Sequence, residues 1–202
     1  MSPSPYTGRT RRWKVNADGH LSLGGCDTVD LVAEYGTPLY LYDEKTLRGI
    51  CREFVREFTD RYPNTAVAYA SKAFINPAIA MLAAEEGLGL DVVSGGELAV
   101  AQTVNFPLDR VYFHGNNKTP AELSMALKQG IGRIVVDGLY ELGLLNELAG
   151  RLGVTQEILL RLSPGVDPHT HAKTTTGILD SKFGISIETG DAERAMRQAL
   201  AS

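Results

Sequence analysis

The sequence lacks long apolar runs and has few cysteines, and both absences exclude classes of protein. No window approaches the about 20 consecutive apolar residues that a membrane-spanning helix needs. The basic start, Arg9 to Lys14, is not followed by an apolar stretch, so it does not resemble a signal peptide. Cys26 and Cys51 lie far apart without CxxC spacing, which argues against a disulfide scaffold or zinc site. A reducing, cytoplasmic location is therefore the expectation.

The chain also lacks an excess of positive charge. Its 20 Lys and Arg residues against 24 Asp and Glu residues give a net charge of -4. This balance argues against a nucleic-acid or anionic-membrane surface. Hydrophobic residues make up 44% of the 202 positions, which is enough for a packed core. We therefore expect a globular protein with neither nucleic acid nor membrane as a partner.

A strand–helix rhythm runs through the chain after residue 60. Short apolar, β-branched runs recur every 21 to 24 residues, starting at Val67, Leu88, Val111, Arg133 and Glu157. Segments of helical spacing separate them, at 76–86, 95–104, 119–129 and 139–152. The third of these opens with the capping-box sequence Thr119-Pro120-Ala121-Glu122. Such alternation predicts an α/β fold with parallel strands, nearly continuously apolar because both faces are buried.

Two architectures fit this repeat: a doubly wound sheet and a (β/α)8 barrel. The even period and the short loops favour the barrel. Only about five βα units are present, with a possible sixth helix at 191–201, whereas a barrel has eight strands and typically about 250 residues. We therefore expect a partial (β/α)8 TIM barrel, in the N-terminal part of a longer protein or in a truncated one.

Three regions are expected along the chain. Residues 1–35 form an N-terminal segment that is partly disordered. Residues 36–66 contain a strand at 38–43 and a long amphipathic helix capped by Asp43. Residues 67–202 form the barrel part.

Lys72 is the first candidate for chemistry. It ends the first strand of the repeat, and barrel active sites lie where the strands end. Apolar surroundings disfavour a charged amine, and a neutral amine can form a Schiff base with an aldehyde. A surface lysine at a strand end is the alternative.

Asp91 and His114 follow on the next two strands. An acid inside the apolar run of Asp91 is costly unless it is paired, and Lys72 on the neighbouring strand is the natural partner. A structural ion pair at the barrel rim is equally compatible. His114 begins the polar segment His114-Gly115-Asn116-Asn117-Lys118, where it could stack on a planar cofactor or simply belong to a polar loop.

Arg161 and two loops complete the candidates. An arginine within the apolar run of the fifth strand usually meets a carboxylate or phosphate. The turn at 94–97, Ser-Gly-Gly-Glu, could hold an anion on backbone N–H groups or only make a tight turn. His169 and His171 make an H-x-H pattern, which is weak for a metal, so we expect no metal and a substrate-facing loop instead.

Taken together, these motifs resemble a known family. The segments YASKAF, GLGLDVVSGGEL, VYFHGNNKTPAEL, RIVVDG, ILLRLSPGVDPHTHAKTTTG and SKFGI are similar to the diaminopimelate decarboxylases. This family has the alanine-racemase-like fold of pyridoxal-phosphate enzymes. The similarity runs from about Gly36 to the end of the chain.

The resemblance implies roles for individual residues. Lys72 would be the catalytic Schiff-base lysine for pyridoxal 5'-phosphate, and Asp91, His114 and Arg161 would bind the cofactor. The substrate-side candidates are Asn116, Lys118, His171 and Thr176. The family also implies a homodimer with active sites at the subunit interface. The family also implies a C-terminal β-domain, which the strand at 39–42 would join and which we expect to lie outside these 202 residues.

The implied reaction is the decarboxylation of meso-2,6-diaminopimelate, an amino acid, to L-lysine and carbon dioxide. The family's phosphate cradle, pyridinium partner and substrate clamp would all lie beyond Ser202, so we expect little activity from residues 1–202 alone. The alternatives are an ornithine-, arginine- or carboxynorspermidine-type decarboxylase, or a non-catalytic truncated homologue. Retention of Lys72 argues against the non-catalytic alternative.

Overall fold

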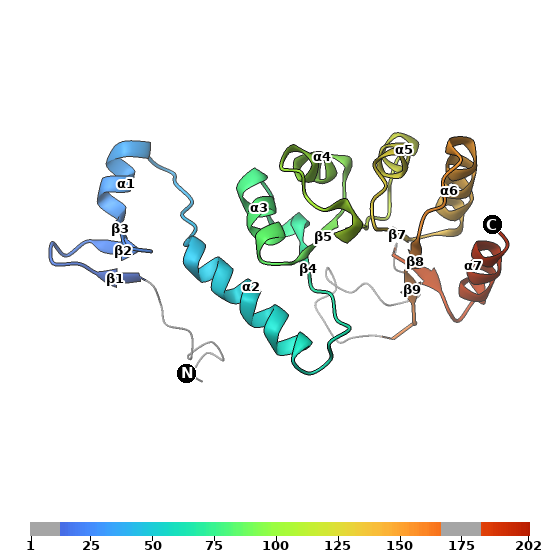
Figure 1. Cartoon of the computed structure of the whole chain (residues 1–202), viewed down its shortest axis with the longest axis horizontal. Coiled ribbons are helices and arrows are strands. Elements are labelled where there is room, and N and C mark those ends of the chain that lie inside the picture. The colour runs from blue at the N-terminus through green and yellow to red at the C-terminus, as the bar shows by residue number, and fades with distance from the viewer. Residues whose placement is uncertain (1–12, 167–182) are drawn as a thin grey trace. The chain divides into compact units, whose positions relative to one another are not determined.

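The computed structural model describes residues 13–166 and 183–202 (Figure 1). The chain divides into two compact units, Met1–Thr65 and Ala66–Ser202. Two of the candidate residues, His171 and Thr176, lie outside the described residues, as does His169 of the predicted loop.

The first unit contains a small antiparallel sheet that the sequence did not predict. Strands β1 (Trp13–Val15), β2 (Leu21–Leu23) and β3 (Cys26–Asp27) pair in the order β1-β2-β3. Helix α1 (Thr28–Tyr35) follows directly, with Asp27 as its N-cap. Strands of two or three residues are too short to leave a clear period in the sequence, so only an N-terminal segment was expected here.

The region that leads to the second unit is predicted only in part. Helix α2 (Glu44–Thr59) forms as predicted, and the Asp43 side chain caps it by accepting a hydrogen bond from the backbone of Lys45. The predicted strand at 38–43 is wrong, because no strand is assigned there. A strand needs a neighbour to pair with, and no described segment pairs with these residues.

The second unit is built on the predicted parallel sheet. Its strands run in chain order: β4 (Ala68–Ala70), β5 (Gly89–Val92), β6 (Val111–Phe113), β7 (Arg133–Val136) and β8 (Ile158–Leu160). The connecting helices are α3 (Pro77–Glu85), α4 (Gly95–Thr103), α5 (Pro120–Gln129) and α6 (Leu139–Leu152). This arrangement confirms the α/β fold and the five βα units.

A sixth, shorter unit follows the fifth. Strand β9 (Leu162–Ser163) comes after β8 with only Arg161 between them, and it pairs in parallel with β10 (Ile185–Ser186). Helix α7 (Asp191–Leu200) then follows, close to the predicted bounds of 191–201. The sequence predicted this helix but not the short strand before it.

Local signals explain where the helices begin and end. The Thr119 side chain and the Glu122 carboxylate cap α5 reciprocally, which confirms the predicted capping box. Gly130 and Gly153 end α5 and α6 in the left-handed conformation, with φ of 65° at both. Asn76 caps α3 through its side chain.

The two faces of the sheet differ in composition. Helices α3 to α6 lie along one side of it (Figure 1). The side chains in register on one face are fully buried: Leu90, Val92, Val111, Phe113, Ile134 and Val136. The other face carries Asp91, Tyr112 and Arg133, also in register and none of them buried. The expectation of strands apolar on both faces is therefore met only in part. On this second face Val135 is apolar and buried, whereas Asp91, Tyr112 and Arg133 are polar or partly exposed.

Candidate functional site

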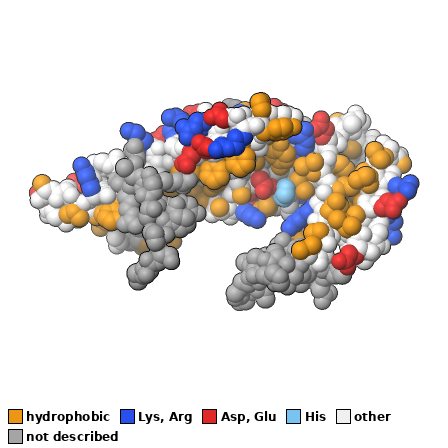
Figure 2. Space-filling view, turned by 90° about the horizontal axis from the view of Figure 1, so that it is seen from below, with side chains coloured by type: hydrophobic (Ala, Val, Ile, Leu, Met, Phe, Trp, Pro, Cys, Tyr) orange, Lys and Arg blue, Asp and Glu red, His pale blue; other side chains and the backbone are white. Residues whose placement is uncertain are grey.

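Charged and polar side chains gather at the carboxyl edge of the parallel sheet. Lys72 lies in the short 3-10 turn after β4, Asp91 lies near the end of β5, and His114 follows β6. Asp137 follows β7, and Arg161 follows β8. Because adjacent parallel strands end at the same edge, these five residues form one carboxyl-edge cluster. Figure 2 shows a surface on which a histidine lies beside acidic and basic side chains, with apolar side chains around them.

Lys72 is exposed at this edge. The apolar surroundings expected for it are therefore not provided by the described residues. Nor does Lys72 form an ion pair with Asp91 within 4.0 Å among residues 13–166 and 183–202, so the predicted direct pairing is wrong. The charges of both side chains instead affect the pKa of Glu97. Burial raises the pKa of Glu97, and among the nearby charges Asp91 raises it further while Lys72 opposes the rise.

Asp91 faces His114 rather than Lys72. The Nε2 atom of His114 lies 3.8 Å from the Oδ1 atom of Asp91. Burial lowers the pKa of His114, Asp91 and Asp137 oppose that change, and the positive charges of Arg161 and Lys118 add to it. The imidazole is therefore neutral near pH 7, where it can both donate and accept a hydrogen bond.

The Oδ1 atom of Asp91 is buried and has no hydrogen-bond partner among the described residues. A buried acceptor without a donor costs free energy, so its presence calls for an explanation such as a bound group. The exposed amine of Lys72, this acceptor and the neutral His114 lie at one edge. Chemically, the arrangement suits a carbonyl compound that an amine can capture and that offers a donor to the carboxylate.

Arg161 is held by a carboxylate, as expected for an arginine within an apolar run. Its Nη1 atom lies 2.8 Å from the Oδ1 atom of Asp137, and its guanidinium carbon lies 4.4 Å from the centre of the Phe183 ring. The other carboxylate oxygen of Asp137 accepts a hydrogen bond from the backbone N–H of Gly184 at 3.1 Å. Asp137 was not predicted as a site residue. An acid directly after the strand in RIVVDG was the available signal.

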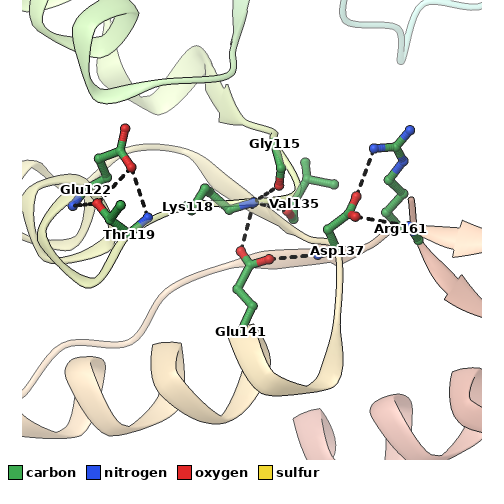
Figure 3. A network of polar contacts seen from close by, with 9 residues as sticks. Gly115, Lys118, Thr119, Glu122, Val135, Asp137, Glu141 and Arg161 are labelled. Carbon is green, nitrogen blue, oxygen red and sulfur yellow. Dashed lines mark hydrogen bonds and ion pairs between the residues drawn. The ribbon is translucent and has the colours of Figure 1, made fainter. Parts of the chain in front are cut away.

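The two candidates in the loop after β6 have different environments. Asn116 is exposed, as a side chain that contacts a small molecule could be. Lys118 is buried, with 1% of its side chain exposed. Its ammonium donates to the carbonyl oxygens of Gly115 and Val135 and pairs with Glu141 (Figure 3). We therefore correct the substrate-side assignment of Lys118, because its donors are already used inside the protein.

Two backbone N–H groups of the Gly-rich turn at 94–97, where an anion was considered, already have acceptors within the protein. The backbone N–H of Gly95 donates to the Glu122 carboxylate at 2.8 Å. The backbone N–H of Glu97 donates to the Ser94 hydroxyl at 3.3 Å. The alternative of a tight turn is the one that these contacts support. The second role of Glu122, beyond the capping box, could not be seen in the sequence because it joins residues 27 positions apart.

The described part of the chain offers neither a metal site nor a membrane-spanning helix. No group of three His, Cys, Asp or Glu side chains there could hold a metal ion. No helix among the same residues has the length and apolar character to cross a membrane.

Comparisons with known proteins point to one family. The family model described as "Pyridoxal-dependent decarboxylase, pyridoxal binding domain" matches residues 48–202. Diaminopimelate decarboxylase from Bacillus methanolicus is 50% identical over 189 residues, which is 94% of this chain and 44% of that protein. The enzyme of the same name from Mycobacterium tuberculosis H37Rv is 42% identical over 202 residues, which is 100% of this chain and 44% of that protein.

Solved structures agree with the sequence relatives. The crystal structure of diaminopimelate decarboxylase from M. jannaschii in co-complex with L-lysine matches with a TM-score of 0.82 and 37% identity. The match covers 93% of this chain and 44% of that one. An arginine decarboxylase from Paramecium bursaria Chlorella virus matches with a TM-score of 0.60 at 18% identity over 76% of this chain and 38% of that one, which shows a shared fold alone. The chain thus spans less than half the length of these relatives.

Proposed function

The chain belongs to the pyridoxal-dependent decarboxylases and carries their pyridoxal-binding domain, and from this premise we propose that it serves the decarboxylation of meso-2,6-diaminopimelate to L-lysine and carbon dioxide. The observation that carries the proposal is the position of Lys72. It is an exposed primary amine at the carboxyl edge of the sheet, the edge that also holds His114 and the buried Oδ1 atom of Asp91, which has no hydrogen-bond partner among the described residues.

The residues at this edge fit pyridoxal phosphate. Lys72 offers the amine that would anchor the group through its aldehyde. The buried Oδ1 atom of Asp91 lacks a donor among the described residues, as expected of an acceptor meant for a bound molecule. His114, kept neutral, would contact the group without adding charge. When bound, pyridoxal phosphate supplies an electron sink for the electron pair that remains when carbon dioxide leaves.

The protein's own residues would then orient the reactants and move protons. Arg161 keeps a guanidinium at the edge, paired on one side with Asp137 and able to face an anionic group on the other. The Nζ atom of Lys72, once free, would carry a proton at the reacting centre. Asn116 is retained as a substrate-side candidate because it is exposed in the loop that follows His114.

The substrate proposal rests on sequence identity. Relatives named diaminopimelate decarboxylase are 42% and 50% identical to this chain, whereas the arginine decarboxylase structure shares 18%. The family resemblance implies a homodimer, and the two widely spaced cysteines favour a reducing, cytoplasmic location. No nucleic acid or membrane is proposed as a partner, given the net charge of -4.

Cofactor attachment is tested by reductive labelling. The chain is incubated with pyridoxal phosphate, reduced with borohydride, digested and mapped by mass spectrometry. We expect a saturable label on Lys72 that Lys72→Arg removes. Lys128→Arg, a change at an exposed lysine of α5, is the matched control and should leave the label in place. A saturable label on another lysine instead of Lys72 would sink the assignment.

Substrate choice is tested by release of carbon dioxide from carboxyl-labelled amino acids. Equal concentrations of meso-diaminopimelate, ornithine and arginine are compared, with Lys72→Ala as the blank. Whatever the absolute rate, we expect meso-diaminopimelate to give the highest release. Faster release from ornithine or arginine would contradict the substrate while leaving the cofactor assignment intact.

A further inference from the structure

A continuous chain of polar contacts links the loop after β6 to Asp137 and Arg161 of the carboxyl-edge cluster (Figure 3). It begins at Lys118 in the loop after β6, passes through Glu141 in the first turn of α6 and Asp137 at the end of β7, and ends at Arg161. Three of its members, Lys118, Glu141 and Asp137, expose between 1% and 12% of their side chains. Lys118 and Glu141 have no role in the function proposed above, and Asp137 enters it only as the partner of Arg161.

Lys118 fixes the loop that carries His114. A buried ammonium is costly unless every donor is satisfied. Here one donor reaches the carbonyl of Gly115 at 2.6 Å, and Gly115 is the residue directly after His114. A second reaches the carbonyl of Val135 on β7 at 2.9 Å, and the third pairs with Glu141 at 2.8 Å. The loop is thereby tied to the neighbouring strand and helix.

Glu141 links Lys118 to Asp137 through its carboxylate. Its second carboxylate oxygen accepts a hydrogen bond from the backbone N–H of Asp137 at 3.0 Å. Asp137 in turn uses both of its oxygens, one for the Arg161 guanidinium and one for the backbone N–H of Gly184. The chain of contacts thus joins the ends of β6, β7 and β8 with the residues that precede β10.

We propose that Lys118, Glu141 and Asp137 act as a buried positioning relay that holds His114 and Arg161 in one fixed arrangement at the carboxyl edge of the sheet. The relay rests on the proposed function, since the two groups it positions are those assigned to the cofactor. Its members touch neither cofactor nor substrate and act through His114 and Arg161.

The relay also sets the charge around His114. Four charged groups face this imidazole: Asp91 from β5, Lys118 from the following loop, Asp137 after β7 and Arg161 after β8. Lys118 and Asp137 act on its pKa in opposite directions, the first lowering it and the second raising it. Removing each charge should therefore shift the titration of His114 in opposite directions. General loosening of the fold would not produce this pair of signs.

The test follows the His114 ring by NMR in the full chain without cofactor, with its signal assigned by its loss in His114→Gln. Lys118→Met removes the charge at nearly equal length and should raise the pKa of His114. Asp137→Asn keeps the shape and should lower it. Lys128→Met, the same change at an exposed lysine in α5, is the matched control and should leave the titration unchanged.

Positioning is read separately, from the backbone amide of Gly184 and the Nε resonance of Arg161. In Lys118→Met and in Glu141→Gln we expect both signals to shift, although neither substituted side chain contacts Gly184 or Arg161. Unchanged signals in both variants, or a His114 titration that moves in the same direction in Lys118→Met and Asp137→Asn, would overturn the relay. If Lys118→Met does not fold, Asp137→Asn still decides, because it leaves the buried ammonium paired and must lower the pKa of His114.

The outcome is distinguishable from failure of the proposed function. These resonances are measured without pyridoxal phosphate, so they do not depend on labelling at Lys72. A missing label with intact relay signals would remove the proposed function and keep the positioning network. The reverse result would keep the cofactor assignment and remove the relay.

Discussion

The Glu122 carboxylate joins two neighbouring βα units, and we expect its removal to lower the free energy of unfolding. One oxygen accepts from the backbone N–H and the hydroxyl of Thr119 at 2.9 and 2.8 Å, which closes the capping box of α5. The other accepts from the backbone N–H of Gly95 at 2.8 Å, at the start of α4. The variant Glu122→Ala removes all three contacts.

The expected loss is about 2–3 kcal/mol of unfolding free energy. A hydrogen bond to a charged group contributes about 1.5–3 kcal/mol, and the partly buried N–H of Gly95 would be left without its acceptor. The capping contact at the exposed Thr119 adds about 1 kcal/mol or less. Glu122→Gln keeps an amide oxygen as acceptor but loses the charge, so it should lose about half as much as Glu122→Ala.

Urea unfolding followed by far-ultraviolet circular dichroism measures the loss at pH 7. The control is Glu147→Ala in α6, which removes one exposed i,i+4 ion pair with Arg151 and should cost about 0.5 kcal/mol or less. The backbone hydrogen bonds from Thr119 and Gly95 lower the pKa of Glu122. Its contribution is therefore complete above the ordinary glutamate pKa of about 4.3 and disappears as the pH falls through the lower value in the folded chain.

Two results would refute this reasoning. The first is a Glu122→Ala variant no less stable than Glu147→Ala at pH 7. The second is a difference between Glu122→Ala and the unchanged chain that persists undiminished well below pH 4. Either result would mean that the carboxylate does not stabilise the junction of α4 and α5 as a charged acceptor.

Three further predictions concern pH, the core and activity. Because the folded chain lowers the pKa of His114, the unfolded chain takes up this proton first, so acidification from about pH 6.5 should reduce stability through this group; His114→Gln should flatten that part of the urea-monitored profile, and an identical profile in both proteins would contradict it. Phe113→Ala, at a fully buried position of β6, should cost about 3–5 kcal/mol in urea unfolding, whereas Tyr140→Ala, at a side chain 84% exposed, should cost less than about 0.5 kcal/mol; equal losses would show that the packed face is not where stability resides. Purified residues 1–202 should release little carbon dioxide from meso-diaminopimelate, because Lys72 is exposed in the described chain and water reaches the reacting amine; robust release in a radiometric assay would refute that expectation.

The helices and the order of the strands could be predicted because their signals are local. The capping residues Asp43 and Thr119 and the terminating Gly153 each act within a few positions of the chain. The apolar runs that start at Leu88 and Val111 contain β5 and β6, since a packed sheet face demands such side chains wherever the strand is paired.

The features that the sequence did not predict depend on contacts between distant parts of the chain. The extended segment at 38–43 has suitable side chains but no pairing neighbour among the described residues, so it is not a strand. The strand of Asp91 has a neighbour on each side, β4 before Lys72 and β6 before His114. Neighbouring strands alone could not show that Asp91 lies 3.8 Å from His114 and forms no ion pair with Lys72 among the described residues. The roles of Asp137 and Lys118 follow from partners on other elements, which periodicity does not reveal.

The register of the sheet separates the side chains that hold the fold from those available for chemistry. One face is the buried apolar layer, and the opposite face carries Asp91, Tyr112 and Arg133 in a single row. Since side chains alternate along each strand, the side chains of that row point away from the buried layer. The sheet can thus diverge in its chemistry, through natural drift or a designed library, while one helical scaffold persists.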